Sequence, residues 1–383
     1  MDKRVGIVGI GTTGFRATTP DVSYRELTYE AAVKAYLDAG VEPGDVGAFV
    51  ATAEDFVEGY SISDEYSPDQ LGAVLKPIHT VPGDFIQSLA NAYMIILTGF
   101  CDIAVVQGLS KASNMLTKGD LRTFAACPFT WRPLRESPHA IAAMEMTRFL
   151  HCTGNTREQC ARVVVKNRRN ALNNPRAAHG ANLELEDVMR AEMRSEPLGK
   201  LDIAQYADGA VVCVIATEEK VKALGKDAIW IKGVGWATEA YSLETRDWES
   251  APYFRLAGDM AYKMADIRTP RKEINFAEIN DEYSFKELQH LEALRLCGKG
   301  ESGKLMETGF TEMTGDFPVN ASGANLGSGA TFDLDGGQKV LEVVLQLRGE
   351  AGANQLKDVR TGLAAGWRGV PTTTGAVAIL SRD

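Results

Sequence analysis

The stretch from Phe317 to Leu380, FPVNASGANLGSGATFDLDGGQKVLEVVLQLRGEAGANQLKDVRTGLAAGWRGVPTTTGAVAIL, decides the fold of this chain. A glycine-rich loop opens a helix expected over residues 337–348, and a second glycine-rich loop precedes the apolar run 375–380. The order of loop, helix, loop and strand predicts one unit of a protein built from alternating helices and strands.

Apolar strands alternate with helices along the rest of the chain as well. Strands are expected over residues 5–10, 47–52, 102–107, 208–217, 228–237 and 274–279. Because these strands are apolar on both faces, the pattern predicts an α/β fold with a mostly parallel sheet that is covered on both sides. The segments DGAVVCVIAT (208–217) and TGAVAILS (374–381) resemble each other, which predicts an internal repeat.

The composition limits the class of protein and its partners. The formal net charge of −10 argues against nucleic acid as a partner, although local cations or helix N-termini can still bind a phosphorylated ligand. The six scattered cysteines form no C-x-x-C pair, which favours reduced thiols over disulfides or a zinc site. We found neither a signal segment nor an apolar run of about 18 residues, so a cytoplasmic protein without a membrane segment is expected.

The loops that open the helix and precede the last strand resemble the C-terminal end of the thiolases. Asn320, Ser322 and Gly323 match the family's first loop, and the resemblance implies that Ser322 and Gly323 contact coenzyme A. The Gly-His-Pro triplet of that loop is missing here, and Ala330 stands where its histidine is expected.

The resemblance covers most of the chain and implies the thiolase fold, a five-layered α/β/α/β/α sandwich of two similar halves. The first half is expected over residues 1–220 and the second over 221–383. The polar segment from about 109 to 200 is then a loop excursion of the first half that covers one face of the sheet. The family also implies an oligomer, either a homodimer or a heteromer.

The nucleophile of the thiolases is a cysteine at the N-terminus of a buried helix, where the helix dipole favours the thiolate. The corresponding segment is HTVPGDFIQSLANAYMIILTG (79–99), and the alignment places the nucleophile near Pro82. Neither cysteine nor serine occurs between Thr80 and Gln87. Asp84 is the reactive side chain nearby, and it is either a general base or the N-terminal cap of the helix.

A second group of candidates follows the strand expected over 274–279. In EINDEYSFKEL, Asn280 matches the family's asparagine, which helps to position a water facing the thioester oxygen. Tyr283 either replaces a packing phenylalanine or acts as an acid. Asp333 and Asp335, just past the missing histidine, are either acids of a remodelled site or caps for the helix that follows.

Two further glycine-containing loops each have two interpretations. In AAGWRGVPTTTG, which lacks the family's second cysteine and its His-Asn pair, Trp367 and Arg368 either line the acyl pocket or form a surface turn. Gly9 to Gly14 match the G-x-G-x-x-G pattern of dinucleotide-binding proteins, but nine residues separate the pattern from the helix expected to start near Tyr24. A structural turn is therefore favoured over a nucleotide site.

Two functions are compatible with this pattern. The first is an acyltransferase-like enzyme that makes or breaks a C–C bond of an acyl-CoA by retro-Claisen or aldol chemistry, within a complex. Its site would consist of Asp84, Asn280, Tyr283 and Asp333, with the coenzyme A thioester as substrate and neither metal nor covalent cofactor. The second is a silent subunit of an intact thiolase.

The family suggests a partner for the enzyme hypothesis. Steroid side-chain aldolases of the superfamily carry tyrosines where Asn280 and Ala330 stand here, and they work with a small zinc-ribbon/OB-fold subunit. The chain departs from the aldolase pattern at both positions, so either such a subunit or an intact thiolase is the expected partner.

Overall fold

The computed structural model describes residues 4–55, 58, 62–115, 123, 126–240, 242–369 and 373–383. Nine strands of the described chain form one mixed sheet in the order β3-β2-β4-β7-β1-β8-β11-β10-β9. The strands are β1 (Val5–Thr12), β2 (Ala48–Thr52), β3 (Ile78–Val81), β4 (Ile103–Lys111), β7 (Asp208–Thr217), β8 (Ile229–Thr238), β9 (Phe276–Ile279), β10 (Thr361–Arg368) and β11 (Thr374–Ser381). A separate hairpin joins β5 (Met193–Ser195) to β6 (Leu198–Gly199).

Helices connect and cover these strands. They are α1 (Tyr24–Ala39), α2 (Ser63–Tyr66), α3 (Pro68–Leu71), α4 (Phe85–Leu97), α6 (Pro138–Thr153), α7 (Arg157–Leu172), α8 (Leu185–Met189), α9 (Glu218–Leu224), α10 (Pro252–Met264), α11 (Pro270–Glu273), α12 (Ser284–Ala293), α13 (Ser302–Glu307), α14 (Ala324–Ser328) and α15 (Asp335–Arg348). Across the described residues, no helix has the length and apolar character that a membrane span requires.

The strand order repeats between the two halves of the chain. β7 lies between β4 and β1 and runs antiparallel to both, and β11 lies in the same way between β10 and β8. The half-sheets meet through a short pairing of β1 with β8, at Gly6 and Trp230. The internal repeat predicted from the two closing strands is therefore present in the topology.

The sheet is mixed, so the prediction of a mostly parallel sheet was wrong. Only the pairings β2–β3, β2–β4 and β9–β10 are parallel, whereas the closing strands β7 and β11 run against their neighbours. A strand covered by helices on both faces is apolar throughout, whichever way it runs. The sequence pattern consequently revealed burial but carried no information on strand direction.

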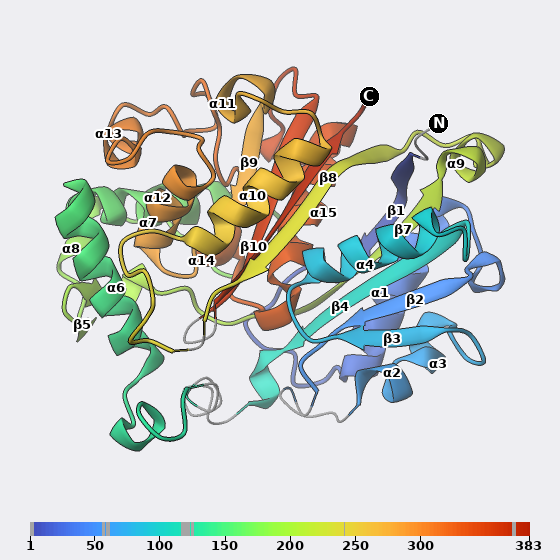
Figure 1. Ribbon diagram of the computed structural model, residues 1–383, viewed down its shortest axis with the longest axis horizontal. Helices are drawn as coiled ribbons and strands as arrows, with labels where there is room; N and C mark the ends of the chain where they lie inside the picture. The colour runs from blue at the N-terminus through green and yellow to red at the C-terminus, as the bar shows by residue number, and fades with distance from the viewer. Residues whose placement is uncertain are drawn as a thin grey trace.

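The five predicted layers are confirmed. α1 packs on the outer face of the first half-sheet, and α10 packs on the outer face of the second. The central helices α4 and α15 contact each other and both half-sheets, and their apolar side chains form one buried core with the strands. The N-terminal ends of α4 and α15 are thereby held together inside the molecule (Figure 1).

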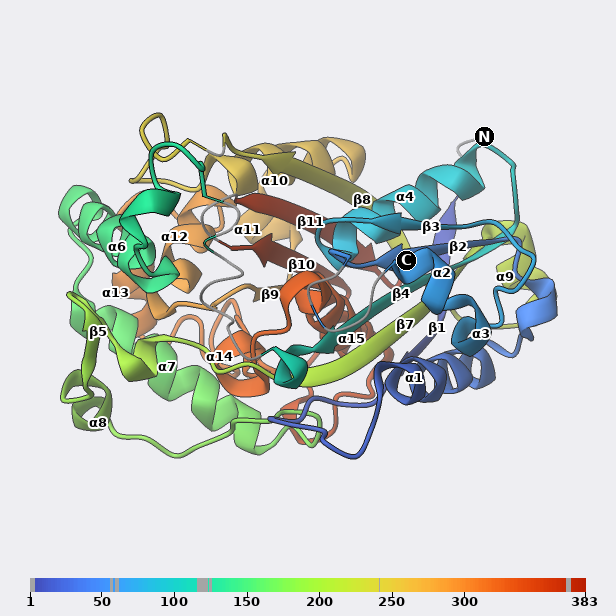
Figure 2. The same cartoon turned by 90° about the horizontal axis from the view of Figure 1, so that it is seen from below.

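The excursion packs on the second half of the chain. α6, α7 and α8, drawn in green, lie beside α12, α13 and α14 at one end of the molecule (Figures 1 and 2). Lys166 of α7 forms a buried ion pair of 2.6 Å with Glu287 of α12, and Asn167 donates a hydrogen bond to Asp281. The excursion thus fixes the segment that follows β9. Residues 116–122, 124 and 125 of the excursion lie outside the described residues.

The glycine run at the N-terminus is part of a strand and its close packing. Gly9 and Gly11 belong to β1, and α1 begins only at Tyr24, with Ser23 as its cap. A Cβ atom on Gly11 would lie 2.1 Å from the carbonyl oxygen of Ala31 in α1. These glycines let α1 pack closely against β1. The G-x-G-x-x-G pattern therefore has the structural role that the sequence favoured.

Replacing Gly11 by alanine should therefore destabilise the fold by about 2 kcal/mol or more, because neither backbone can move away freely. Gly44→Ala is the matched control, since a Cβ atom there meets nothing within 4 Å. Urea unfolding of both variants measures the difference. Equal stabilities of the two variants would show that α1 does not depend on this close approach.

Candidate functional site

One carboxylate ties the two central helices together at their N-termini. Asp84 is the N-cap of α4 and accepts hydrogen bonds from the backbone N–H of Ile86 (2.8 Å) and of Gly336 (2.7 Å) in the first turn of α15. The side chain of Gln87 accepts from the backbone N–H of Asp84, which completes a capping box. Asp84 is therefore the N-terminal cap of α4, which is one of the two roles expected for it. The same carboxylate also joins the two halves of the chain.

Asn280 reaches the same place from the end of β9. Its Nδ2 donates to Oδ2 of Asp335 (2.9 Å), and its Oδ1 accepts from the backbone N–H of Glu282 (3.0 Å). Oδ2 of Asp335 also accepts from the backbone N–H of Trp367. Because Asp335 and Gly336 are neighbours, the first turn of α15 brings Asn280 and Asp84 into one buried polar cluster.

Burial and neighbouring charge change the proton affinity of this cluster. Burial raises the pKa of Asp84 to about 7, with a further contribution from the charge of Asp335. Lys339, one turn along α15, supplies the positive charge, with its Nζ 2.9 Å from Oδ1 of Asp335 and 2.6 Å from Oδ1 of Asn325. A carboxyl group that titrates near neutral pH can both take and return a proton.

Tyr283 lies on the wall of the cluster, with both a packing role and a polar contact. It precedes α12, is fully buried, and its ring stands edge-on to that of Trp367 at 6.3 Å between centroids. Its hydroxyl lies 3.3 Å from Nδ1 of His139 in α6. The ring therefore fills the space of a phenylalanine, while the hydroxyl faces the excursion.

Asp333 lies on the other side of the cluster, against the first half of the chain. One of its oxygens accepts from the backbone N–H of Glu54 (2.5 Å), and the other lies 3.6 Å from Nε of Arg368. Burial, together with the charges of Glu58 and Asp84, raises the pKa of Asp333 well above its usual range. The structure thus places Asp333 within electrostatic reach of Asp84.

The prediction that Asp333 and Asp335 could cap the following helix was wrong. α15 begins at Asp335 itself, and its N-cap is Leu334, with no side-chain cap. A single turn of 3-10 helix (Phe332–Leu334) precedes the helix and directs both carboxylates toward other loops. The caps were inferred from proximity in sequence, which does not reveal this extra turn.

The loop residues assigned to coenzyme A are buried and hold the loop in place. The backbone N–H and hydroxyl of Ser322 donate to Glu278 of β9, at 3.0 and 2.6 Å. Gly323 has φ +95°, and a Cβ atom there would lie 2.6 Å from the Cβ of Ala171 in α7. Further along, Ala330 pairs through its backbone with the segment that precedes β7.

Trp367 is buried within β10, so the surface-turn interpretation was wrong for this residue. Its ring faces Tyr283, His290 and the ammonium group of Lys286, which lies 4.6 Å from the ring centroid. Arg368 pairs with Glu54 across the halves. Residues 370–372 of the same loop lie outside the described residues.

Sequence reasoning missed a set of buried polar residues on α12. Lys286, fully buried, binds Glu145 of α6 at 2.5 Å, and His290 lies one turn further along the same face of the helix. In the sequence, SFKELQHLEALRL has only the pattern of a helix that follows a strand. The sequence did contain a signal for these buried polar residues, because polar residues occur on every face of this helix although it follows an apolar strand.

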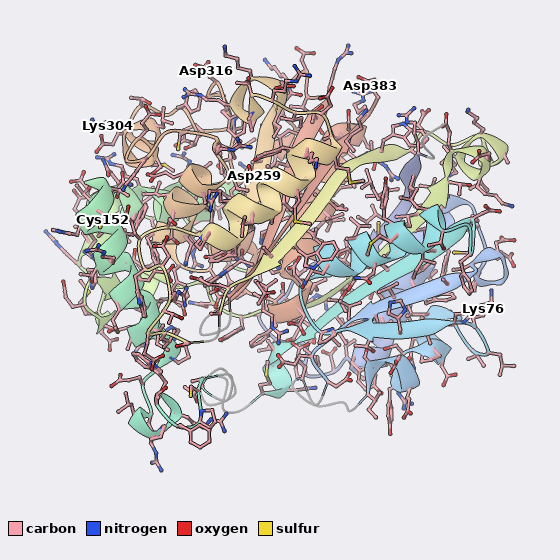
Figure 3. The ribbon with its side chains drawn as sticks, viewed as in Figure 1. Lys76, Cys152, Asp259, Lys304, Asp316 and Asp383 are labelled. Carbon is pink, nitrogen blue, oxygen red and sulfur yellow. The ribbon has the colours of Figure 1, made fainter. Side chains whose placement is uncertain are left out.

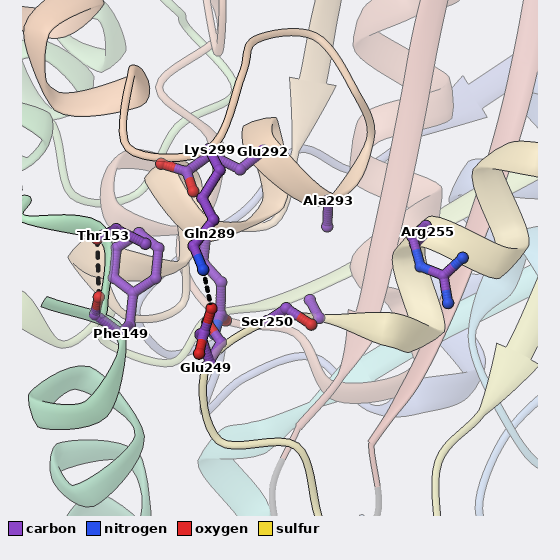
Figure 4. A pocket seen from close by; sticks show the side chains of 10 residues that line it. Phe149, Thr153, Glu249, Ser250, Arg255, Gln289, Glu292, Ala293 and Lys299 are labelled. Carbon is purple, nitrogen blue, oxygen red and sulfur yellow. Dashed lines mark hydrogen bonds and ion pairs between the residues drawn. The ribbon is translucent and has the colours of Figure 1, made fainter. Parts of the chain in front are cut away.

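A cavity and a cysteine that could be taken for functional features lie away from the polar cluster. A cavity of about 150 Å³ lies between α6, α10 and α12, with Phe149, Ala251 and Ala293 among its walls (Figure 4). Cys152 lies on α6 at the edge of the molecule, far from the first turn of α4 (Figure 3). Among the described residues, no group of three or more histidine, cysteine or acidic side chains could hold a metal ion.

Comparisons with known proteins agree with this architecture. Residues 235–382 match the family model described as thiolase C-terminal domain-like. An acetyl-CoA acetyltransferase of Methanothermobacter thermautotrophicus is 30% identical over 99% of both chains. A 17-hydroxy-3-oxo-4-pregnene-20-carboxyl-CoA lyase of Mycobacterium tuberculosis is 28% identical over 97% of this chain and 98% of its own.

A solved structure entitled Ltp2-ChsH2(DUF35) aldolase superposes with a TM-score of 0.84 and 26% identity, covering 99% of this chain and 97% of its own. The strand repeat, the paired central helices and these full-length similarities lead to one conclusion. The chain belongs to the thiolase superfamily.

Proposed function

We propose that this chain is an enzyme that acts on acyl-CoA thioesters and breaks or forms a C–C bond by aldol chemistry, without an acyl-enzyme. One observation carries the proposal. A buried polar cluster around the carboxyl group of Asp84 occupies the N-termini of α4 and α15, although no cysteine stands between Thr80 and Gln87. The site has therefore lost its nucleophile but kept groups suited to proton transfer.

Aldol cleavage needs such groups and no thiolate. A base removes the hydroxyl proton of a 3-hydroxyacyl-CoA, and the bond between the α and β carbons breaks. Its electron pair moves into the thioester as an enolate, and a proton then returns to the α carbon. The products are an aldehyde or ketone and a shorter acyl-CoA, so atoms and charge balance without a covalent intermediate on the protein.

The residues of the cluster supply these roles in the proposal. Asp84 takes and returns the proton, because its pKa of about 7 lies near the working pH. Asn280 uses one amide N–H for Asp335 and has a second N–H to offer to the enolate oxygen. Tyr283 packs against Trp367 next to the cluster, and Asp333 binds the backbone N–H of Glu54 in the first half. The two helix N-termini add positive ends that favour a developing negative charge.

The relatives support both the reaction and a partner. One relative is a lyase of a steroid carboxyl-CoA. Another relative, from Thermomonospora curvata, is a steroid side-chain-cleaving aldolase. The name of the superposed structure includes a DUF35 protein together with the aldolase. We propose that this chain, too, works with a small subunit of that type, in the cytoplasm. We also assign the two halves to residues 1–220 and 221–383, which agrees with the repeat of the strand order.

A silent subunit of an intact thiolase is the second candidate. The missing cysteine and the alanine at position 330 favour it, as does the use of the Asn280 amide to hold Asp335. The first prediction below distinguishes acyl-enzyme chemistry from aldol chemistry, and the second distinguishes the enzyme from the silent subunit.

Incubation with acetyl-CoA or acetoacetyl-CoA should leave the mass of the intact protein unchanged, because no cysteine lies at the start of α4. Mass spectrometry of the intact chain, with and without its partner, measures this. A stoichiometric acyl adduct that disappears when one cysteine is changed to alanine would show that thiolase chemistry persists.

Asn280→Ala should lower turnover by roughly 10²–10³, the cost of losing one donor to an oxyanion. Asn155→Ala is the matched control, since Asn155 is a buried amide that hydrogen-bonds Glu292 and Ser302 away from the cluster. Steady-state kinetics and thermal melting separate activity from folding. Unchanged activity of the complex with Asn280→Ala would favour the silent subunit.

Asp84 should make the folded state less stable as the pH rises from about 4 to about 7. Its pKa in the fold is raised to about 7, so the folded chain keeps a proton that the unfolded chain loses near pH 4. The contribution of Asp84 to the free energy of unfolding is complete below pH 4 and is lost by pH 7. Between these values the free energy of unfolding falls by up to about 1.4 kcal/mol per pH unit.

The test is urea unfolding of wild type, Asp84→Asn and the exposed control Asp21→Asn at several pH values between 4.5 and 7. We expect only Asp84→Asn to flatten the dependence. If Asp84→Asn and Asp21→Asn follow the same pH profile, Asp84 is ionised throughout this range and cannot supply the proton.

A further inference from the structure

A chain of buried hydrogen bonds ends on the backbone of Asn280. His290 of α12 is fully buried, and its Nδ1 lies 3.0 Å from the carbonyl oxygen of Asn280. Its Nε2 lies 3.3 Å from the hydroxyl of Tyr253 in α10, and that hydroxyl accepts a hydrogen bond of 3.1 Å from Nζ of Lys286. Two side chains, Tyr253 and His290, therefore connect the buried ammonium group of Lys286 to one residue of the candidate site.

The hydrogen-bond partners of His290 determine its tautomer. A carbonyl oxygen only accepts, so Nδ1 of His290 carries the hydrogen and Nε2 is the acceptor. Tyr253 must then donate to Nε2, which it can do because its oxygen already accepts from Lys286. Burial and the nearby charge of Lys286 lower the pKa of His290 well below its usual range, which keeps the ring neutral.

Lys286 is itself held in one orientation. Its Nζ donates to Glu145 (2.5 Å) and to the side chain of Gln289 (2.8 Å), and Arg246 binds the second oxygen of Glu145 at 2.9 Å. All of these charged groups are buried, so the pairing is not screened by water. The orientation of the Tyr253 hydroxyl follows from this fixed ammonium group.

The same helix face also supports Trp367. The ring centroids of His290 and Trp367 lie 5.9 Å apart, and the ammonium group of Lys286 faces the Trp367 ring. The backbone N–H of Trp367 and the side chain of Asn280 both donate to Oδ2 of Asp335. A shift of the Asn280 backbone would therefore move its amide relative to Asp335 and the Trp367 wall.

We infer that His290 is a positioning residue for Asn280, and that Tyr253 and Lys286 act by holding His290 in the tautomer that donates to the Asn280 carbonyl. The inference rests on the proposed function, because the position of Asn280 matters for turnover only if its amide faces the thioester. A residue with a purely structural role would change stability and leave kcat unaffected.

The experiment compares four variants of the chain in complex with its partner. Tyr253→Phe removes the donor to Nε2, His290→Phe removes both ring nitrogens, and His290→Asn keeps a donor near the position of Nδ1. Tyr262→Phe is the matched control, because Tyr262 is a buried tyrosine of the same helix whose hydroxyl donates to the carbonyl of Leu294 instead. Kinetics use the better substrate of 3-hydroxybutyryl-CoA and 3-hydroxydecanoyl-CoA, both of which carry the hydroxyl that aldol cleavage requires.

Tyr253→Phe and His290→Phe should lower kcat by about 10- to 100-fold with little change in KM, since a small displacement of a positioned group has an effect of this size. His290→Asn should recover part of the loss, and Tyr262→Phe should stay near wild type. Nitrogen-15 NMR of the histidine-labelled full chain should find a protonated Nδ1 and a bare Nε2 on His290 from pH 6 to 8.

Two results would overturn the inference. One is a protonated Nε2 on His290, and the other is a kcat for Tyr253→Phe equal to that for Tyr262→Phe. Absence of turnover by the wild-type complex on both 3-hydroxyacyl-CoA thioesters would instead refute the proposed function and, with it, any positioning role. The NMR result would still decide the tautomer in that case.

Discussion

The rest of the structure depends on one carboxylate that accepts hydrogen bonds from two helices. Asp84 caps α4 and also accepts from Gly336 in the first turn of α15, so this one side chain joins the central helices of the two halves. Both helices thereby point their positive ends at the same buried point. Asn280 is held next to this point by its hydrogen bond to Asp335, and the charge of Asp84 reaches Asp333.

Keeping so many polar groups in a dry interior requires paired charges. Lys339 balances Asp335, and Lys166 balances Glu287 beneath the loop that carries Asn280. Removing one member of such a pair typically costs about 3–5 kcal/mol, because the remaining charge stays buried. The excursion is therefore more than a cover over the sheet. Its helix α7 supplies the cation and the amide of Asn167 that hold the segment after β9 in place.

The sequence predicted the covered strands and the repeat because buried strands and helix periods are local signals, whereas the five layers followed from the resemblance to the thiolases. The resemblance also pointed to Asp84 and Asn280, which the structure places at the start of α4 and directly after β9, and their roles in a reaction stay a prediction. Strand direction, the extra turn before α15 and the burial of Trp367 depend on contacts between distant segments. For the same reason His290 was not recognised, since its partners Asn280 and Tyr253 lie 10 and 37 residues away along the chain.

The central claim is that the cluster cleaves a C–C bond without an acyl-enzyme. The most direct measurement is product analysis of the chain mixed with a DUF35-type subunit and 3-hydroxydecanoyl-CoA. The account predicts octanal and acetyl-CoA in equal amounts, with no requirement for free coenzyme A. Cleavage that depends on added coenzyme A and yields two acyl-CoA products from a 3-oxoacyl-CoA would contradict it, because those products require thiolase chemistry.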